Sequence, residues 1–554
     1  MPDLLDSLDV DQRSAAEALL GPVVILAGAG TGKTRTITHR IAHGVASGIY
    51  AANRVLALTY TNRAAGEIRL RLRQLGVGPV AVKTFHAAAL GQLEYFWPQF
   101  AGVPAPMILS GKTAMLSSVS SQRGIDLDSP SLRDLASEIE WRKLSMMSLD
   151  KYAELSSRPQ VAGLSHTKNV ELQRAYEEAK IKAQKIDFED VLILTLGLLR
   201  AEPRALEHVR QQYRFFTVDE YQDVSPLQHA LLDEWLGERN DICVVGDPNQ
   251  TIYSFTGATS DFLKGFSTRF DDATEIQLSR NYRSTKEVVN FANQLADGGL
   301  DALESQLDLG ATPTIASYAN DLEEAEATAK AVKRQLELGV PAHDVAILYR
   351  VNGQSEAFEN ALSKLHIEYS VRGGERFFNR TEIQQAMQGV RAEAVLSTDK
   401  SLRHSVTDIC RSLGWQSKEP AEAGATRDRW FALSAFLGIL DEMPDDATLV
   451  DFANELDERK RSQHEPLQSS VTLSTIHAVK GLEWPVVFVA GLSEGYLPIS
   501  FAKTDFEIAE EQRLLYVAVT RAGKELQLSW AKRDELHARD RSPSRFLARF
   551  AKVG

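Results

Sequence analysis

The sequence has few cysteines, no long apolar run and no excess of basic residues, and each absence excludes a class of protein. Only two cysteines occur in 554 residues, which rules out a disulfide framework and indicates a reducing compartment. No apolar run is long enough to cross a membrane, and the aspartate-rich N-terminus does not resemble a signal peptide. The net charge of −13 argues against a globally basic nucleic-acid binder but leaves room for a local basic groove.

A glycine-rich turn near the N-terminus is the most informative stretch of the chain. The apolar residues 23–27 predict a buried strand, and Thr34 to Ile41 predict a helix. Between them, backbone N–H groups and a helix N-terminus would face an anion across the turn Gly28-Ala29-Gly30-Thr31-Gly32-Lys33. We interpret this as a P-loop in which Lys33 reaches the terminal phosphates and Thr34 ligates Mg²⁺. Ala27 stands where the strict pattern has glycine, and the alternative is a glycine-rich turn without a ligand.

Two further apolar segments end in polar residues of the kind that P-loop enzymes use. The strand predicted for 215–218 delivers Asp219 and Glu220 to the carboxyl edge of a sheet, where open α/β sheets bind ligands. We predict that Asp219 belongs to the Mg²⁺ shell and that Glu220 is the catalytic base. A second strand, 242–245, leads to Gln250, which is placed to sense a γ-phosphate or to polarise water.

Aromatic and polar residues after several predicted strands suit a single-stranded nucleic acid. Tyr60 and Asn62 follow one strand and precede a helix rich in arginine. Tyr253 and Phe255 directly follow the predicted phosphate sensor, so they would couple nucleotide state to base stacking, at about 1–3 kcal/mol per base. The alternatives are a solvated helix face for the arginines and core packing for the two aromatics. His86, after another strand, is typical of a packed or capping residue.

The order of predicted elements indicates an α/β protein with two cores, each interrupted by a mainly helical insertion. The predicted boundaries are 1–86 and 200–279 for the first core, 87–199 for its insertion, 280–374 and 468–554 for the second core, and 375–467 for the second insertion. We expect no strands in 87–199. In the second core we expect strands at 314–318, 345–349, 369–372, 471–477, 486–490 and 526–530, and a helix over 510–520. Only the first core has a P-loop, whereas the second carries Arg283 and Arg521. We therefore expect the nucleotide between the cores, with these arginines stabilising phosphoryl transfer and a hinge near Leu278 and Ser470.

Together these motifs resemble a superfamily 1 helicase of the UvrD/Rep/PcrA group. The matching segments are Gln12 with its neighbours, 27–34, 58–65, 84–86, 218–223, 246–253, 281–284, 373–378, 475–483 and 516–522. The resemblance implies two RecA-like P-loop NTPase-type cores, named 1A and 2A, with insertions 1B and 2B. It also implies ATP-driven 3′→5′ translocation on single-stranded DNA, and unwinding of duplex DNA in repair or replication restart.

The resemblance further implies roles for individual residues. Gln12 would contact adenine, with Arg35 and Tyr282 flanking the base. The implied ATP site comprises Gln12, Ala29, Gly30, Thr31, Gly32, Lys33, Thr34, Arg35, Tyr282, Arg283, Glu483 and Arg521, with Thr34 and Asp219 on Mg²⁺. The implied catalytic residues are Lys33, Glu220, Gln250, Arg283 and Arg521. The implied DNA track comprises Tyr60, Thr61, Asn62, Thr84, His86, Tyr253, Phe255, Asn352, Thr475 and His477.

The same resemblance implies the surroundings of the enzyme. The expected cofactors are ATP and Mg²⁺, and the expected partners are single-stranded DNA, single/double-strand junctions and DNA repair proteins, with no membrane. The expected location is the cytoplasm, at the bacterial nucleoid.

Three departures from the family pattern bear on activity. Thr256 stands where the family commonly has arginine, the 2B-like insertion is short, and the expected hairpin after Trp530 has only His537 as a candidate for separating base pairs. They favour a compact bacterial relative and leave a second hypothesis, a translocase that displaces bound proteins with little unwinding. A third hypothesis, a nucleotide-gated switch with negligible turnover, does not need a complete hydrolytic set and is disfavoured.

Overall fold

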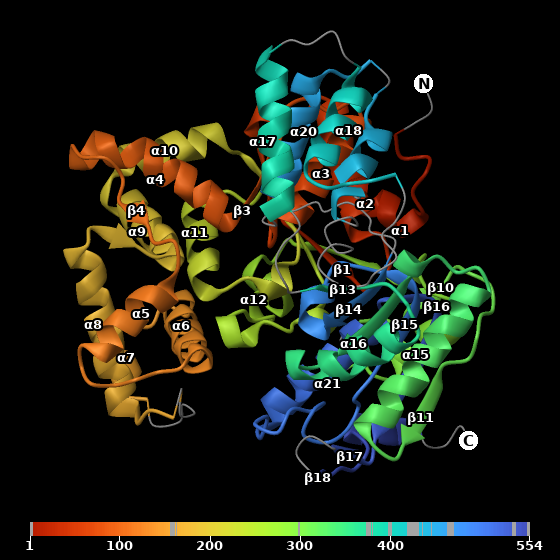
Figure 1. The fold of residues 1–554 in the computed structure, drawn as a ribbon. Coiled ribbons are helices and arrows are strands. Elements are labelled where there is room, and N and C mark those ends of the chain that lie inside the picture. The colour runs from red at the N-terminus through yellow and green to blue at the C-terminus, as the bar shows by residue number, and fades with distance from the viewer. Residues whose placement is uncertain are drawn as a thin grey trace. The chain divides into compact units, whose positions relative to one another are not determined.

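The computed structural model describes residues 4–155, 161, 163–296, 300–372, 378, 381–396, 401–417, 432–434, 436–444, 446–462, 470–534 and 539–550. The chain divides into two compact units (Figure 1). The first comprises Met1–Ser279 and Gly298–Asp301, and the second comprises Arg280–Asp297 and Ala302–Gly554. Each unit contains a six-stranded parallel sheet. The prediction of two RecA-like α/β cores is confirmed.

The sheet of the first unit has the strand order β3-β2-β6-β7-β1-β8. Its strands are β1 (Val23–Ala27), β2 (Val55–Thr59), β3 (Ala81–Thr84), β6 (Phe215–Val218), β7 (Ile242–Gly246) and β8 (Thr274–Leu278). Alternate residues of β1 enter different cores, with Val24 in one cluster and Val23 and Ile25 in the other. Because all strands are parallel, the segments after β1, β6 and β7 emerge at one edge. The P-loop, the Asp219-Glu220 pair and the segment 247–250 therefore lie at the same edge of the sheet.

Helices cover both faces of this first sheet and build its insertion. Around the sheet lie α1 (Val10–Glu17), α2 (Lys33–Ala46), α3 (Asn62–Gln74), α11 (Pro226–Leu236), α12 (Asp261–Lys264) and α13 (Phe266–Arg269). The insertion contains α4 (Phe85–Ala101), α5 (Lys112–Ser121), α6 (Ser129–Leu144), α7 (Leu149–Ala153), α8 (His166–Lys182), α9 (Phe188–Ala201) and α10 (Pro203–Gln212). The expectation that 87–199 has no strands is wrong in one detail, because β4 (Met107–Ile108) pairs with β5 (Lys185–Ile186). Two dipeptides so far apart in the chain leave no periodic signal.

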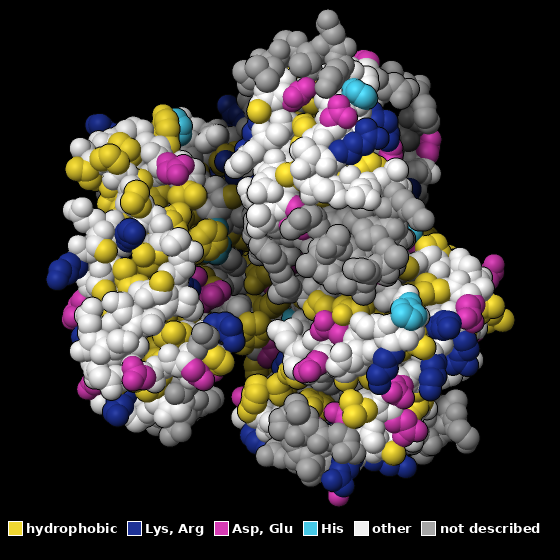
Figure 2. Space-filling view, in the orientation of Figure 1, with side chains coloured by type: hydrophobic (Ala, Val, Ile, Leu, Met, Phe, Trp, Pro, Cys, Tyr) yellow, Lys and Arg dark blue, Asp and Glu magenta, His cyan; other side chains and the backbone are white. Residues whose placement is uncertain are grey.

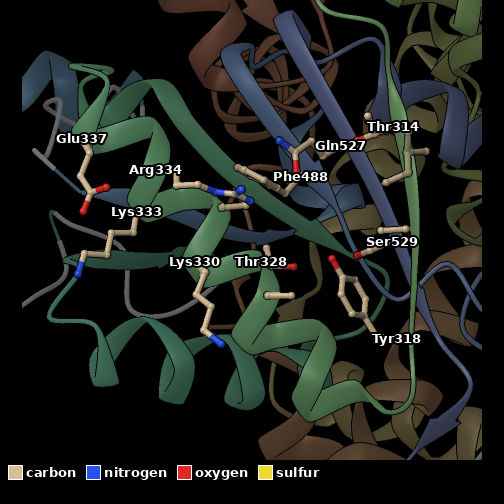
Figure 3. A pocket seen from close by; sticks show the side chains of 14 residues that line it. Thr314, Tyr318, Thr328, Lys330, Lys333, Arg334, Glu337, Phe488, Gln527 and Ser529 are labelled. Carbon is tan, nitrogen blue, oxygen red and sulfur yellow. The ribbon is translucent and has the colours of Figure 1, made fainter.

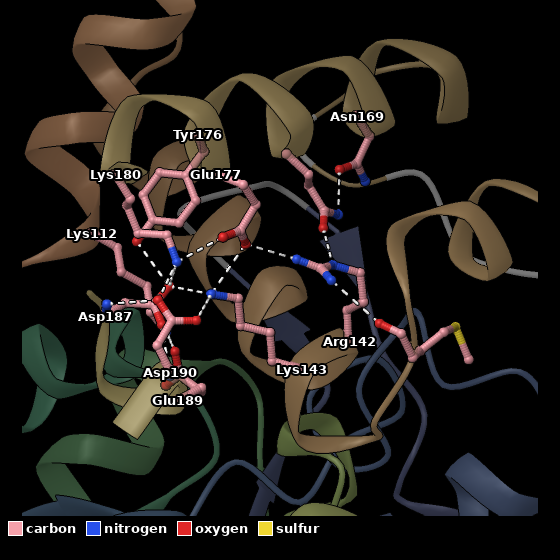
Figure 4. Close-up of polar contacts among 12 residues, drawn as sticks. Lys112, Arg142, Lys143, Asn169, Tyr176, Glu177, Lys180, Asp187, Glu189 and Asp190 are labelled. Atoms are coloured by element: carbon pink, nitrogen blue, oxygen red, sulfur yellow. Dashed lines mark hydrogen bonds and ion pairs between the residues drawn. The ribbon is translucent and has the colours of Figure 1, made fainter. Parts of the chain in front are cut away.

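A buried ion cluster joins α6, α8 and the start of α9 inside this insertion (Figure 4). Lys143 Nζ lies 2.7 Å from a carboxylate oxygen of Asp187 and 2.7 Å from one of Asp190. Lys180 contacts the same two carboxylates, and Glu177 contacts both lysines. Burial alone would raise the pKa of Asp187, but Lys143 and Lys180 bring it well below its usual range. Arg142 lies 2.9 Å from Glu177, so three cations face the three carboxylates of this buried cluster.

The sheet of the second unit has the order β11-β16-β15-β12-β14-β13. Its strands are β11 (Thr314–Tyr318), β12 (Val345–Tyr349), β13 (Tyr369–Arg372), β14 (Val471–Thr475), β15 (Trp484–Val489) and β16 (Ala522–Ala531). Short pairs form between β9 (Arg280–Asn281) and β10 (Glu304–Ser305), and between β17 (Arg533–Asp534) and β18 (Arg539–Asp540). β14 ends earlier than the predicted 471–477, because a 3₁₀ turn, η9 (Ile476–Val479), follows it.

The second unit includes the helices α14 (Lys286–Asn293), α15 (Asp321–Glu337), α16 (Ser355–Lys364), α17 (Thr381–Leu396), α18 (Leu402–Ser412), α20 (Leu449–Ser462) and α21 (Asp505–Val519). α21 begins before the predicted Glu510, because Thr504 and Glu507 form a capping box upstream of the apolar stretch. Helices α17, α18 and α20 share a hydrophobic core of their own, which includes Phe436 and Phe452. Among the described residues, no helix is both long and apolar enough to cross a membrane.

A cleft of about 480 Å³ lies under α15 at the edge of the second sheet. Its walls come from α15, β11, β15 and β16, and Figure 3 shows the Arg334 side chain extending toward Phe488. Lys330 and Lys333 extend away from Phe488 in the same view. None of the residues predicted to bind ATP or DNA lines this cleft.

Candidate nucleotide and DNA sites

The turn after β1 has the backbone of a phosphate-binding loop. Gly30 and Gly32 have φ values of +71° and +80°, which favour glycine. Gly32 is the N-cap of α2, so the first N–H groups of that helix belong to the turn. Lys33 folds back over the turn, where its Nζ donates to the carbonyl oxygens of Ala27 (3.0 Å) and Gly28 (3.3 Å). The ammonium is thereby held at the loop, where phosphate oxygens can replace the two carbonyls.

Gln12 fixes α1 against this turn. Its side chain is buried, with Nε2 donating to the carbonyl oxygen of Thr31 (2.9 Å). A Cβ added at Gly32 would lie 2.7 Å from the same Nε2, so the contact also needs the glycine. The isolated sequence around Gln12 is that of a surface glutamine, but the structure places it inside. Arg35, the other predicted base neighbour in this unit, is exposed and donates to the carbonyl oxygen of Ser7 (2.6 Å).

Asp219 has the features of a metal-shell carboxylate. It follows β6 directly, and its backbone N–H donates to Leu58 of the neighbouring strand (2.8 Å). The side chain is 5% exposed, and its Oδ1 has no hydrogen-bond partner among the described residues. Burial and the neighbouring Glu220 raise the pKa of Asp219 to about 7, whereas Lys33 opposes this shift. A buried carboxylate near Lys33, with one oxygen that lacks a hydrogen-bond partner among the described residues, fits a cation brought in with a nucleotide.

A chain of side-chain hydrogen bonds connects the predicted base with the predicted sensor. Gln222 Nε2 donates to Glu220 Oε2 (2.5 Å), and Gln222 Oε1 accepts from the backbone N–H of Asp247 (3.1 Å). Gln250 Nε2 in turn donates to Asp247 Oδ2 (2.7 Å). Sequence reasoning found the two ends of this chain but assigned no role to Gln222 or Asp247. The available signal was their position, because Asp247 directly follows the apolar strand β7 and Gln222 lies in the short turn after β6.

The second unit gathers three of the predicted ATP-site residues around Thr520. Arg283 donates through Nε to Glu483 Oε2 (2.5 Å) and through Nη1 to the carbonyl oxygen of Thr520 (3.0 Å). Arg521 is 2% exposed and donates to Leu482 (3.1 Å) and to the Thr520 hydroxyl (3.0 Å). Its guanidinium is thus held inside its own unit. Tyr282, next to Arg283, is 44% exposed.

Three aromatic rings form a cluster in the first unit, with two of them stacked. The Tyr60 and Tyr253 rings lie 5.1 Å apart at 14°, and Phe255 meets Tyr253 edge-on at 6.1 Å. Phe255 is 52% exposed, so the alternative of core packing is wrong for this residue. The Thr256 hydroxyl donates to the carbonyl oxygen of Tyr253 (2.8 Å). Thr256, which departs from the family pattern, therefore stabilises the turn 253–256, called the aromatic turn below because it carries Tyr253 and Phe255.

Other predicted DNA residues of the first unit lie at the start of helices. The Thr61 and Thr84 hydroxyls cap α3 and α4, and Asn62 is the exposed first residue of α3. His86 stacks on Phe188, with ring centroids 4.2 Å apart. Burial lowers the pKa of His86 to about 4, so the ring is neutral at pH 7. Helix N-termini at this edge provide partial positive charge that suits a phosphodiester backbone.

The predicted DNA residues of the second unit follow two neighbouring strands. Asn352 is exposed after β12. Thr475 ends β14, which pairs with β12, and His477 lies in η9 directly after it. Burial lowers the pKa of His477 to about 3, so it too is neutral. Of the other expectations for this unit, residues 373–377 and His537 lie outside the described residues, although the β17–β18 pair that flanks His537 is formed.

On the face drawn in Figure 2, the lysine and arginine side chains of the described residues lie among aspartate and glutamate and form no continuous basic surface. Within the described ranges, no group of three or more His, Cys, Asp or Glu side chains could hold a metal ion.

The two parallel sheets, with a P-loop and a strand-end Asp-Glu pair in the first, define a P-loop NTPase with two RecA-like cores. Family models refine this class. The UvrD/REP helicase N-terminal domain matches residues 8–271, and the UvrD-like helicase C-terminal domain matches 276–438 and 416–533. The chain belongs to the UvrD/REP helicase family of superfamily 1A, as its motifs predicted, and is an ATP-hydrolysing enzyme of that family.

Several bacterial proteins are similar to this chain over nearly its whole length. ATP-dependent DNA helicase UvrD2 from Mycobacterium tuberculosis is 42% identical, over 98% of this chain and 81% of that protein. ATP-dependent DNA helicase PcrA from Bacillus subtilis is 28% identical, over 98% and 86%. DNA helicase II from Escherichia coli is 29% identical, over 98% and 87%.

Proposed function

We propose that this protein is an ATP-dependent DNA helicase that moves 3′→5′ along single-stranded DNA. The observation that carries the proposal is the continuity of one segment in the first unit. The buried Gln250 contacts the hydrogen-bonded chain that leads to Glu220, and the aromatic turn with Tyr253 and the exposed Phe255 begins three residues later. A change at the phosphate end of this segment is therefore transmitted over a few residues to a surface on which bases can stack.

In the proposed mechanism, Lys33 and the N–H groups of the P-loop bind the β- and γ-phosphates. Thr34 and Asp219 would hold Mg²⁺, which would supply positive charge against the charge that develops on the phosphates. Glu220 accepts the proton of the attacking water, and Gln250 orients that water. The unpartnered Oδ1 of Asp219 and the ammonium of Lys33, held at the loop by carbonyl oxygens, support these roles.

The second unit contributes its basic residues in the ATP-bound state of this proposal. Glu483 and the carbonyl oxygen of Thr520 each accept one hydrogen bond from Arg283. These two bonds orient the guanidinium and use only two of its five N–H donors. Arg521 has to exchange its present bonds to Leu482 and Thr520 before it can contact a phosphate. Such an exchange makes ATP binding a conformational switch for this unit.

We further propose that the motor acts in DNA repair or replication restart, at single/double-strand junctions, with repair proteins as partners in the bacterial cytoplasm. The alternative is a translocase that removes bound proteins with little unwinding. The one observation that favours it is Thr256, whose hydroxyl bonds its own turn where the family commonly has an arginine. Both versions require the same ATPase and the same DNA track.

Unwinding assays on tailed duplexes test the proposal. With ATP and Mg²⁺, we expect the protein to unwind a duplex with a 3′ single-stranded tail, to leave a 5′-tailed duplex intact, and to hydrolyse ATP faster with single-stranded DNA. Fast displacement of streptavidin from a biotinylated single strand, without unwinding, would select the translocase alternative. ATP hydrolysis that ignores DNA would contradict both.

The aromatic turn should contribute directly to DNA affinity. We expect Phe255→Ala to weaken binding of an oligothymidylate by about 5- to 150-fold, because a stacked base contributes about 1–3 kcal/mol. Fluorescence anisotropy with a labelled oligonucleotide measures this loss, and the affinity for a fluorescent ATP analogue should not change. Phe501→Ala is the matched control, because Phe501 is 70% exposed and is not among the predicted DNA residues. Equal DNA affinity in both variants would remove Phe255 from the track.

A further inference from the structure

We propose that Gln222 is a positioning residue that sets the orientation of the catalytic base and connects it to the phosphate sensor. The inference rests on the proposed roles of Glu220 and Gln250. Gln222 is 0% exposed and therefore contacts neither solvent nor substrate directly. Its importance comes from the two groups that its amide joins.

The orientation of the Gln222 amide follows from its neighbours. The backbone N–H of Asp247 donates to Oε1 over 3.1 Å, and an N–H donor requires an acceptor. The oxygen must therefore point toward Asp247, which leaves Nε2 pointing toward Glu220 Oε2, 2.5 Å away. A flipped amide would place two donors together at Asp247 and two acceptors together at Glu220. One side chain thus specifies both contacts.

The backbone around this amide is shaped to accept it. A Cβ added at Gly246 would lie 2.4 Å from Gln222 Oε1 and 2.8 Å from a methyl of Leu263, so any side chain at 246 would displace the glutamine. Glu220 has φ of +54°, an uncommon conformation for a non-glycine residue. Strained backbone of this kind persists where surrounding contacts hold it, and the bond from Gln222 is one of those contacts.

The same amide links two strands that carry different functions. Glu220 follows β6, whereas Asp247 follows β7 and accepts a hydrogen bond from Gln250 (2.7 Å). A shift of the loop after β7, when Gln250 meets or loses a γ-phosphate, would move the backbone N–H of Asp247. Gln222 would then rotate and carry the Glu220 carboxylate with it. The Glu220 carboxylate is therefore aligned for catalysis only when the loop with Asp247 and Gln250 is in the position that contacts ATP.

Substitutions at 222 separate this role from a merely structural one. Gln222→Glu keeps the acceptor for Asp247 but replaces the donor to Glu220 with a like charge, and Gln222→Met removes both bonds at similar volume. We expect both to lower kcat for DNA-stimulated ATP hydrolysis by about 10- to 100-fold, because a hydrogen bond to a charged group is lost. The KM for ATP and the affinity for a fluorescent ATP analogue should change less than about twofold, because the side chain at position 222 does not contact the nucleotide.

Two further variants make the experiment specific. Gln228→Met is the matched control, because Gln228 is also buried but bonds only within the capping box of α11, so its kcat should stay near wild type. Gly246→Ala should reproduce the kinetic loss of Gln222→Met, although alanine adds no functional group. Single-turnover hydrolysis by the double variant Glu220→Gln/Gln222→Met should be no slower than that of Glu220→Gln, because Gln222 acts through Glu220.

The outcomes distinguish failure of this inference from failure of the proposed function. If Glu220→Gln is inactive but both Gln222 variants keep the wild-type kcat, Gln222 is not a positioning residue. A raised KM or weakened nucleotide binding with unchanged kcat would likewise overturn it, since that pattern indicates a distorted ATP site. If Glu220→Gln itself hydrolyses ATP normally, Glu220 is not the base and the proposed mechanism fails, whereas hydrolysis that ignores DNA contradicts the proposed function itself.

Discussion

Glu220→Gln is expected to lower the kcat of single-stranded-DNA-stimulated ATP hydrolysis by about a hundredfold to ten-thousandfold, the range typical of a lost general base. The glutamine amide has nearly the shape of the carboxylate but cannot accept a proton from the attacking water. Binding of ATP should survive, because Lys33, the P-loop N–H groups and Asp219 remain in place. The variant should therefore bind nucleotide and DNA without turning over.

Steady-state hydrolysis with and without single-stranded DNA, together with titration of a fluorescent ATP analogue, measures both parts of this expectation. Glu207→Gln serves as the control, because Glu207 is an exposed glutamate of α10 in the same unit. It should hydrolyse ATP at the wild-type rate. Persistent DNA-stimulated turnover in Glu220→Gln would mean that another group activates the water.

The second large effect concerns stability. Lys143→Met is expected to reduce the free energy of unfolding of the first unit by about 3–5 kcal/mol, because it leaves buried carboxylates without a compensating charge. The Lys143 side chain is 3% exposed and pairs with Asp187 and Asp190 at 2.7 Å, and with Glu177 at 3.1 Å. Loss of its ammonium leaves these three acidic groups against Lys180 and Arg142. Removing one partner of a buried network is costly, even where the intact network adds little.

Urea denaturation followed by circular dichroism measures this loss. The exposed ion pair between Arg174 and Asp150 is the control, and Arg174→Met should change stability by no more than about 1 kcal/mol. The pKa of Asp187 is lower in the folded protein than in the unfolded chain, so its contribution is present above about pH 4 and is lost on acidification. The difference between wild type and Lys143→Met should therefore narrow at low pH. If Lys143→Met and the wild type have the same free energy of unfolding at pH 7, the cluster does not have this role.

The sequence alone was sufficient for the class of protein and for most strands. Strands β11, β12 and β13 lie at the predicted positions. All five residues of β12 are buried, as expected for an apolar run in the interior of a parallel sheet. The P-loop and the Asp-Glu pair were recognisable for a related reason. Each motif is a short segment at the end of a strand. Its residues are neighbours in the sequence and are therefore also close together in the structure.

Element boundaries were less accurate where caps outweigh hydrophobic periodicity. Helix α21 starts at Asp505 because Thr504 and Glu507 satisfy its first N–H groups, although the apolar stretch begins later. The pairing of β4 with β5 was missed because each strand has only two residues. Neither feature changes the repeating pattern from which helices and strands are predicted.

The sequence by itself determined what chemistry the protein carries, because P-loop, carboxylates and aromatics are encoded as residue types at short, fixed spacing. Only the tertiary structure decided how those groups are held. Lys143 meets Asp187, and Gln222 meets Asp247, through contacts between segments far apart in the chain. Such contacts depend on how strands and helices pack in three dimensions, and one sequence read along its length contains no record of that packing.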